Sequence, residues 1–436
     1  MARIAVLLAF AANGVLFGTW TPRIPAVQET LGLDDGRLGL ALLAPALGSV
    51  GSMLLTGLLV QRFGAGRVMG CALVGFSMTL PLVGVAPSLP WLFIALLVWG
   101  AAMGSLDVSM NAAGLGVQRE YGRPVLSGFH AAFSAGGLVG ALLGSLAAGA
   151  GVPVAAHLAV AGAAGLVVTA VVVRIPVPDP GAPAAGAPDL GASGIGAPDL
   201  GASGIGVADL GAPGQGPSDV GAPGEGPASG IGGVVGPLLR NRALALLALL
   251  AFAGLLAEGA AADWSAVYLS GSLGASAGLA GAGFVAFSVT MTAGRLVGDR
   301  VVARFGPVRT VRVAAATATL ALAAALLADE TWAALAGFAV LGAGLAVLVP
   351  VIFTAAAERT ATPATAVAGV STCGYLGFIA GPPLIGGFAS VTSLSSALWL
   401  VVALTAVVAL LAPITRTAAQ PPARQDARAA GRAPQP

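Results

Sequence analysis

The stretch GSMLLTGLLVQRFGAGRVM (residues 51–69) decides the fold, because AGRLVGDRVVARFGPVRTV (residues 293–311) repeats its pattern. The two segments align without a gap and share a valine, the tripeptide Arg-Phe-Gly and an arginine three residues beyond that glycine. Self-similarity at distant places in one chain indicates an internal duplication. The sequence therefore predicts two similar halves joined by a central segment.

The composition indicates whether these halves lie in water or in a membrane. The 436 residues are 57% hydrophobic and only 9% charged, whereas soluble domains carry about 25% charge. Apolar runs of about 20 residues, long enough to cross ~30 Å of hydrocarbon as a helix, recur along the chain. Runs such as ALALLALLAFAGLLA (residues 243–257) are apolar on all sides and lack the alternation of apolar and polar residues that barrel strands show. We expect an all-α membrane protein with twelve transmembrane helices, near 4–21, 38–60, 67–86, 91–116, 128–149, 153–173, 243–268, 278–298, 311–328, 332–354, 364–386 and 394–414.

The segment between the sixth and seventh runs has a different character. From Ala187 it repeats with a ten-residue period, beginning APDLGASGIG. Gly, Pro, Ala and Asp supply too little apolar surface to offset the entropy of ordering the chain. We therefore expect two pseudo-symmetric six-helix bundles at residues 1–175 and 239–415, a disordered cytoplasmic linker at 176–238 and a disordered cytoplasmic tail at 416–436.

The arginines predict the orientation of the chain, which contains no lysine. If the N-terminus is cytoplasmic, one side holds Arg62, Arg67, Arg119, Arg123, Arg174, Arg240, Arg242, Arg300, Arg304, Arg309, Arg312, Arg359 and Arg416. The opposite side holds Arg23 and Arg37. By the positive-inside rule both termini are cytoplasmic in a bacterial plasma membrane. Because topology accounts for the net charge of +2, nucleic acid is not expected as a partner.

Several classes of chemistry have no signature here. The absence of lysine excludes a Walker-type ATPase, and neither a zinc-protease motif nor a nucleophile elbow occurs. Cys71 and Cys373 lie within apolar runs and give no disulfide framework or metal-ligand spacing. We therefore expect no enzyme, no cofactor and no metal site.

One carboxylate stands out in WGAAMGSLDVSMNAAG (residues 99–114). A charge near the centre of a transmembrane helix costs about 2.5–3.5 kcal/mol, so Asp107 should face the bundle interior or a wet cavity. Asn111 follows one turn later on the same face. Asp107 is interpreted as a group that gains and loses a proton as its access changes sides. The alternative is a permanently hydrogen-bonded tie between helices.

The same reasoning extends to other polar side chains within the runs. The further candidates for substrate or proton binding are Asn111, Glu258, His130, Asp263, Trp264, Asn13 and Trp20. Glu258 lies near the middle of the seventh run, where a charge is costly. Asp263 and Trp264 are nearer its outer end. His130, at the inner start of the fifth run, titrates near neutrality and could exchange a proton with Asp107, or it could be a solvated helix-end residue.

The loop after the second run is similar to a known signature. The motif G-x-x-x-D-R-x-G-R-R of the major facilitator superfamily is matched at Gly57, Arg62, Gly64 and Arg67, and again at Arg304, Gly306 and Arg309. Gln61 replaces the usual Asp in the first loop, and Asp299 with Arg300 is expected to supply a comparable ion pair in the second. The resemblance implies that the residues of these loops gate the protein, namely Arg62, Arg67, Arg295, Asp299, Arg300 and Arg304. Alternatively the arginines only anchor the inner loops.

Spacing adds one specific gating hypothesis. Arg295 and Asp299 are four residues apart, at the inner end of the eighth run. They could meet as a pair on one helix, or reach across to another helix when the inner side is closed.

A narrower resemblance rests on polar residues in the fourth run and at the start of the fifth. Asp107 followed by Asn111, then His130 and Ser134, looks like the fucose-permease-related sugar and proton symporter branch, and other segments look like uncharacterised bacterial inner-membrane members. The stretch NGVLFGTWTPRIP (residues 13–25) departs from that branch, because it has no acid where the fucose permeases carry an Asp.

The resemblance implies a function. It implies a secondary transporter that is monomeric and lies in the lipid bilayer. Such a protein moves a small solute, such as a sugar or related polar metabolite, by alternating access with proton coupling. An efflux antiporter for an apolar or cationic compound is an alternative that two buried acids would suit. A transport-inactive membrane sensor is a third possibility.

Overall fold

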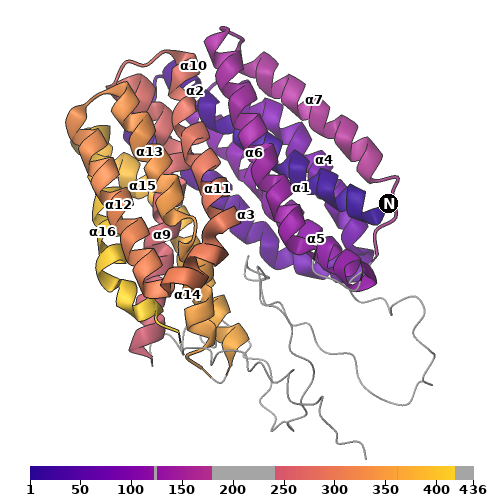
Figure 1. Cartoon of the computed structure of the whole chain (residues 1–436). Coiled ribbons are helices and arrows are strands. Elements are labelled where there is room, and N and C mark those ends of the chain that lie inside the picture. Colours follow the sequence, from indigo (N-terminus) through magenta and orange to yellow (C-terminus); the bar gives the residue numbers. More distant parts are fainter. Residues whose placement is uncertain (122–124, 179–240, 361, 418–436) are drawn as a thin grey trace, which may run out of the picture.

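The structure is a computed structural model that describes residues 1–121, 125–178, 241–360 and 362–417. Within these ranges the chain is helical and contains no strand. The linker expected at 176–238 and the tail expected at 416–436 lie almost entirely outside the described residues. Figure 1 shows two groups of helices, one from each half of the sequence.

The first half contains α1 (Ala2–Trp20), the short η1 (Thr21–Arg23), α2 (Ile24–Leu31), α3 (Asp35–Phe63), α4 (Ala65–Gly84), α5 (Leu89–Tyr121), α6 (Leu126–Gly149) and α7 (Val154–Val172). The second half contains α9 (Arg242–Val267), η2 (Tyr268–Ser272), α10 (Ala277–Ala280), α11 (Ala282–Phe305), α12 (Pro307–Ala328), α13 (Thr331–Leu345), α14 (Leu348–Ala357), α15 (Pro363–Val391), α16 (Leu394–Leu411) and η3 (Ala412–Thr415).

The prediction of twelve membrane-spanning helices is confirmed. Among the described residues, eleven helical segments are long and apolar enough to cross a membrane, and α3, which bends by 45° between Met53 and Leu55, completes the set. The first span runs on from α1 through η1 into α2, and the tenth is interrupted between α13 and α14. Several helices continue beyond the apolar run that predicted them, as α11 does to Phe305.

The loop that is repeated at residues 51–69 and 293–311 shows the symmetry between the halves. Gly64 links α3 to α4 with φ 86° and ψ 148°, and Gly306 links α11 to α12 with φ 78° and ψ 156°. This positive-φ conformation is accessible to glycine at little cost and strained for other residues. The duplicated motif therefore encodes the same turn in both halves.

Close packing in the first half depends on glycines of α6. A Cβ added at Gly136 or at Gly140 would collide with the backbone oxygen of Ala11 or Val15 on α1. At Gly144 the nearest atom is the backbone oxygen of Thr19, 3.0 Å away. Small residues of this kind let two helix backbones approach each other, which is the main source of helix association in lipid.

Gly140→Val should consequently destabilise the first half. The new side chain would overlap Val15 and the Thr19 amide, whose nitrogen lies only 2.9 Å from the added Cβ. Overpacking of this kind costs roughly 3 kcal/mol, so we expect the melting temperature in detergent to fall by about 10 °C. Gly128→Val on the same helix is the control, since its Cβ would meet nothing within 4 Å. Equal melting temperatures for the two variants would contradict the packing argument.

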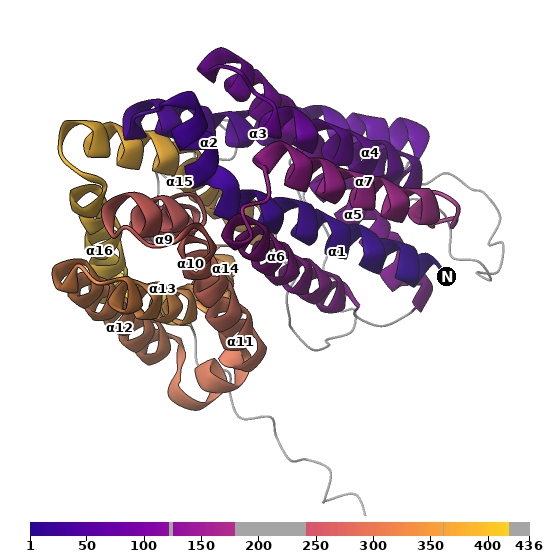
Figure 2. The same ribbon diagram turned by 90° about the horizontal axis from the view of Figure 1, so that it is seen from above.

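Contacts between the halves gather at one end of the molecule. We call the end where α3 joins α4 and α11 joins α12 the arginine-rich end, and the other the opposite end. At the opposite end α3 packs on α15, and α10 packs on the end of α6. A Cβ at Gly39 would lie 2.5 Å from the Pro382 oxygen, and one at Gly149 would lie 3.2 Å from Gly278 Cα. In Figures 1 and 2 the halves lie side by side, and in Figure 1 their helices diverge toward the end where α5 and α14 finish.

Candidate functional site

An ion pair occupies the middle of the second half. Arg295 of α11 places Nη2 3.4 Å from Oε1 of Glu258 on α9. The side chains are 42% and 25% exposed, respectively. Charged groups this far along a membrane-spanning helix are costly in hydrocarbon and usually face a protein interior or water. We therefore expect the pair to face water between the halves rather than lipid.

Of the two alternatives that spacing allowed for Arg295, the structure shows a contact with another helix and not the pair within α11. In the conformation that the structure describes, Arg295 pairs with Glu258 and not with Asp299. Because α11 continues to Phe305, Arg295 lies near the middle of the helix instead of at its inner end, where it faces Glu258 of α9. Asp299 and Arg300 are exposed one turn nearer the arginine-rich end. A gating role for these residues stays a prediction.

Asp107 lies on α5 in the first half and is partly buried. The Nδ2 of Asn111 donates to the Asp107 backbone oxygen at 2.9 Å and to its Oδ1 at 3.2 Å. Both contacts are within α5, so this hydrogen bond does not tie two helices together. Gly104 and Gly100 lie one and two turns earlier, and the space beside them is occupied by Ser49 and Pro45 of α3, respectively. They bring α3 close to α5 and do not leave room for a ligand.

Two further side chains connect the halves electrostatically. His130 of α6 interacts with the charge of Arg295, and its ring packs edge-on against Phe10 with centroids 5.2 Å apart. Tyr375 of α15 lies within electrostatic range of both Asp107 and Glu258. We call Asp107, His130, Glu258, Arg295 and Tyr375 the central cluster.

The candidates named from the sequence include four members of the central cluster, Arg295 among them as a gating residue, but not Tyr375. The available signal was weak: the chain has only 3 tyrosines, and this one lies inside an apolar run. A hydroxyl at that depth is less costly than a charge, so it did not stand out.

The remaining substrate candidates lie elsewhere. Asn13 is 2% exposed and donates from Nδ2 to the sulfur of Met110 at 3.7 Å. Trp20 and Trp264 are 3% and 0% exposed, and the Trp264 ring lies beside Gly386 at the opposite end. Asp263 is partly buried, and no hydrogen bond or ion pair among the described residues joins it to the central cluster.

The predicted gating arginines of the two repeated loops adopt matching positions. The guanidinium of Arg62 lies 5.4 Å from the ring centre of Phe63, and that of Arg304 lies 5.6 Å from the ring of Phe305. Arg67 lines an apolar pocket beside α4. These contacts fit either a gate or an anchor for the loop.

Within the described ranges, no group of three or more His, Cys, Asp or Glu residues could hold a metal ion. The central cluster instead combines two carboxylates, one guanidinium, an imidazole and a phenol. Such a set can exchange protons and form hydrogen bonds with a polar molecule.

Comparison with known proteins places this arrangement in a family. The profile of the Major Facilitator Superfamily matches residues 4–262 and 246–435. An uncharacterised MFS-type transporter of Yersinia pestis is 33% identical over 399 residues, which is 91% of either chain.

Solved structures agree on the fold. A crystal structure of the nucleoside transporter NupG has a TM-score of 0.72 at 13% identity, covering 95% of this chain and 100% of the other. The fucose:proton symporter FucP of E. coli has a TM-score of 0.56 at 14% identity, covering 95% and 98%. The chain therefore belongs to the Major Facilitator Superfamily and is a multi-pass membrane protein that transports a small solute.

Proposed function

We propose that the chain carries a small polar solute together with protons by alternating access, with the central cluster as the binding site. The observation that carries the proposal is the position of the cluster: Arg295 of α11 pairs with Glu258 of α9, and α11 packs on α6 of the first half, which holds His130. In transporters of this architecture, substrate and coupling ion bind at the interface of the repeats.

The direction of opening follows from the arginines. The positive-inside rule makes the arginine-rich end cytoplasmic. The contacts between α3 and α15 and between α6 and α10 then close the outer side. On this basis we assign the conformation as inward-open, and an outward-open state requires these contacts to separate.

Charge balance supports a proton as the coupling ion. Arg295 neutralises Glu258, whereas the hydrogen bonds described for the Asp107 side chain come from the neutral amide of Asn111. Enclosing an unneutralised carboxylate in a low-dielectric interior is costly. A carrier with Asp107 protonated would thus pass through the closed intermediate more readily than one with Asp107 charged, which couples reorientation to proton binding.

Hydrogen-bonding capacity supports a neutral polar solute. Arg295 and Asn111 offer N–H donors, Tyr375 offers a hydroxyl, and the two carboxyl groups accept. The second candidate is export of a cation in exchange for protons. It is favoured by the excess of one negative charge, since the cluster has two carboxylates and one guanidinium.

Flux measurements in proteoliposomes test both candidates. Vesicles with an entrapped pH-sensitive dye would be given inward gradients of sugars, polyols, nucleosides or organic cations. For symport, one neutral solute acidifies the lumen as it enters. For antiport, an entering cation makes the lumen more alkaline. If no solute alters the pH and none moves across the membrane, the proposed function is wrong.

Arg295→Gln should separate function from folding. A partly exposed ion pair contributes about 0–1 kcal/mol to stability, so the melting temperature should change little. Transport should nevertheless fall at least about tenfold, because ~1.4 kcal/mol of lost binding in the cycle is enough for that. The control is Arg37→Gln, which removes an exposed pair with Asp34 at 3.5 Å, outside the cluster. Equal transport by the two variants would show that Arg295 is not part of the binding site.

A further inference from the structure

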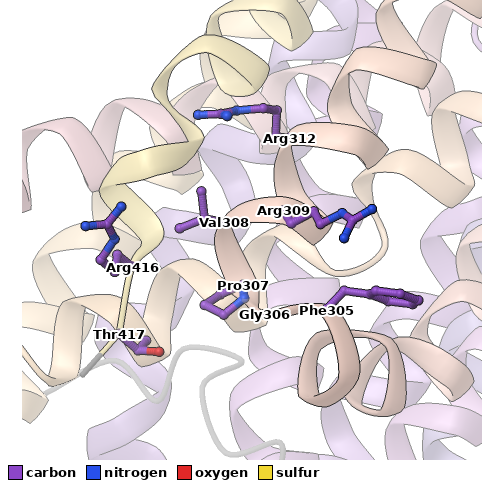
Figure 3. Close-up of a pocket in the computed structure, with 8 residues that line it drawn as sticks. All are labelled: Phe305, Gly306, Pro307, Val308, Arg309, Arg312, Arg416 and Thr417. Atoms are coloured by element: carbon purple, nitrogen blue, oxygen red, sulfur yellow. The ribbon is translucent and has the colours of Figure 1, made fainter. Parts of the chain in front are cut away.

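A second polar site lies at the arginine-rich end of the second half. A pocket of about 450 Å³ opens where α12 begins, and three of its lining residues are Arg309, Arg312 and Arg416. In Figure 3, Arg312 and Arg416 extend on one side of the start of α12, and Arg309 extends on the other, near Phe305. In the described part of the chain, no acidic side chain lines this pocket.

The start of α12 adds to the positive character of the pocket. The helix has no side-chain cap and no acidic residue in its first turn. Its first amide groups have no acceptor within the helix, and its dipole presents positive charge at this end. Three guanidinium groups beside such a terminus favour an anion with several oxygen atoms, as a phosphate has.

Two contacts hold the arginines in place. The guanidinium of Arg309 lies 5.6 Å from the ring centre of Phe305. Arg359, at the end of α14, donates from Nη2 to the backbone oxygens of Ile414 and Arg416. The segment that carries Arg416 is thereby fixed against the second half.

An apolar stripe leads from the pocket along the helix. Val313, Leu320 and Leu327 are 54%, 70% and 76% exposed and recur every seven residues on α12. Arg309 precedes Val313 by one turn and lies on nearly the same face. Exposed apolar side chains at this depth contact the acyl chains of the bilayer. A ligand that fits both features has a phosphate joined to hydrocarbon.

The duplicated loop of the first half lacks this site. Counting from the matching glycines, Gly70 stands where the second half has Arg312. A Cβ at Gly70 would lie 2.7 Å from the Val173 side chain, and one at Gly66 would lie 3.3 Å from that of Val177. Apolar side chains therefore pack on the loop in the first half, whereas the second half is open and basic. The shared turn alone does not explain the arginines.

We propose that this pocket binds the phosphate of an anionic phospholipid of the inner leaflet, whose acyl chains lie along the exposed stripe of α12. Basic pockets at the cytoplasmic side of transmembrane helices suit such headgroups, and each arginine near an anionic lipid strengthens binding about fivefold. The site is separate from the central cluster and does not depend on the transported solute.

The test uses the purified full chain in detergent, titrated with soluble dihexanoylphosphatidylglycerol, dihexanoylphosphatidylcholine or inorganic phosphate, and followed by microscale thermophoresis. We expect phosphatidylglycerol to bind at least about tenfold more tightly than either other probe. The double variant Arg312→Gln/Arg416→Gln should weaken that binding by about 25-fold, since each arginine accounts for about fivefold. The control is Arg3→Gln/Arg174→Gln, which removes two arginines from the same end of the first half and should weaken it less than twofold.

Each other outcome overturns the proposal. Equal weakening by both double variants would mean that diffuse surface charge attracts the lipid. Binding of phosphatidylcholine as tight as that of phosphatidylglycerol would exclude recognition of the anionic headgroup. Inorganic phosphate binding as tightly as the lipid would assign the site to a free anion. The single variant Arg416→Gln, beyond the end of η3, disturbs no helix and repeats the test if the double variant fails to fold.

Discussion

Asp107→Asn is expected to abolish proton-coupled flux while leaving membrane insertion and the melting temperature unchanged. The amide keeps the size of the side chain and still accepts the hydrogen bond from Asn111, whose Nδ2 lies 3.2 Å from Oδ1. It cannot bind and release a proton. The cycle that depends on neutralising Asp107 therefore loses its coupling ion.

The measurement is the same dye assay in proteoliposomes, with counterflow of the solute as a second readout. We expect the variant to lose pH-driven uptake and to keep exchange of the solute between equal pools. Asp329→Asn is the control, because it makes the same chemical change at the end of α12, where φ is +53° and Asn is well tolerated. If the Asp107→Asn variant takes up solute under a pH gradient at the parental rate, Asp107 has no role in proton coupling.

The second large effect is expected at the outer closure. Gly39→Val should prevent the two halves from meeting, because its Cβ would lie 2.5 Å from the Pro382 oxygen and 3.1 Å from Gly386 Cα. Overpacking costs roughly 1–3 kcal/mol, and each ~1.4 kcal/mol is a factor of ten in a population ratio. The outward-open state should gain about tenfold to a hundredfold in population, and net transport should fall with it.

Labelling of a single cysteine measures this shift. Thr21 on η1 is 1% exposed in the closed arrangement, so a Thr21→Cys reporter, with Cys71 and Cys373 replaced, should react faster with an impermeant maleimide once the outer side opens. Gly387→Val is the matched control, since its Cβ would meet nothing within 4 Å. If Gly39→Val loses transport while the reporter stays as slow as in the parent, the contact is not a closure.

The fold could be predicted from the sequence because its two main determinants are local. Length and hydropathy of each run set the twelve helices, and the glycine of the repeated loop sets the turn at Gly64 and at Gly306. The ends of helices were harder to predict. The last turns of α11 carry Asp299 and two arginines to Phe305 beyond the apolar run, and the break between α13 and α14 falls within a run that is apolar throughout.

The central cluster was only partly predictable. Asp107 and Glu258 were found because a charge inside an apolar run is costly wherever the helix points. The partner of Glu258 could not be found in this way. Arg295 is 37 residues away in sequence, and their pairing depends on how α9 and α11 are rotated against each other.

The contact of α3 with α15 has one more consequence. Glycine and the carbonyl of a proline meet there, so the fit depends on the path of the main chain and not on the chemistry of any side chain. The side chains that we propose to bind the cargo, those of the central cluster, are not part of this contact. Mutation can then exchange those residues, and with them the compound carried, while the moving parts of the transporter remain as they are. A family with this arrangement can acquire new substrates while the contact that closes the transporter is kept.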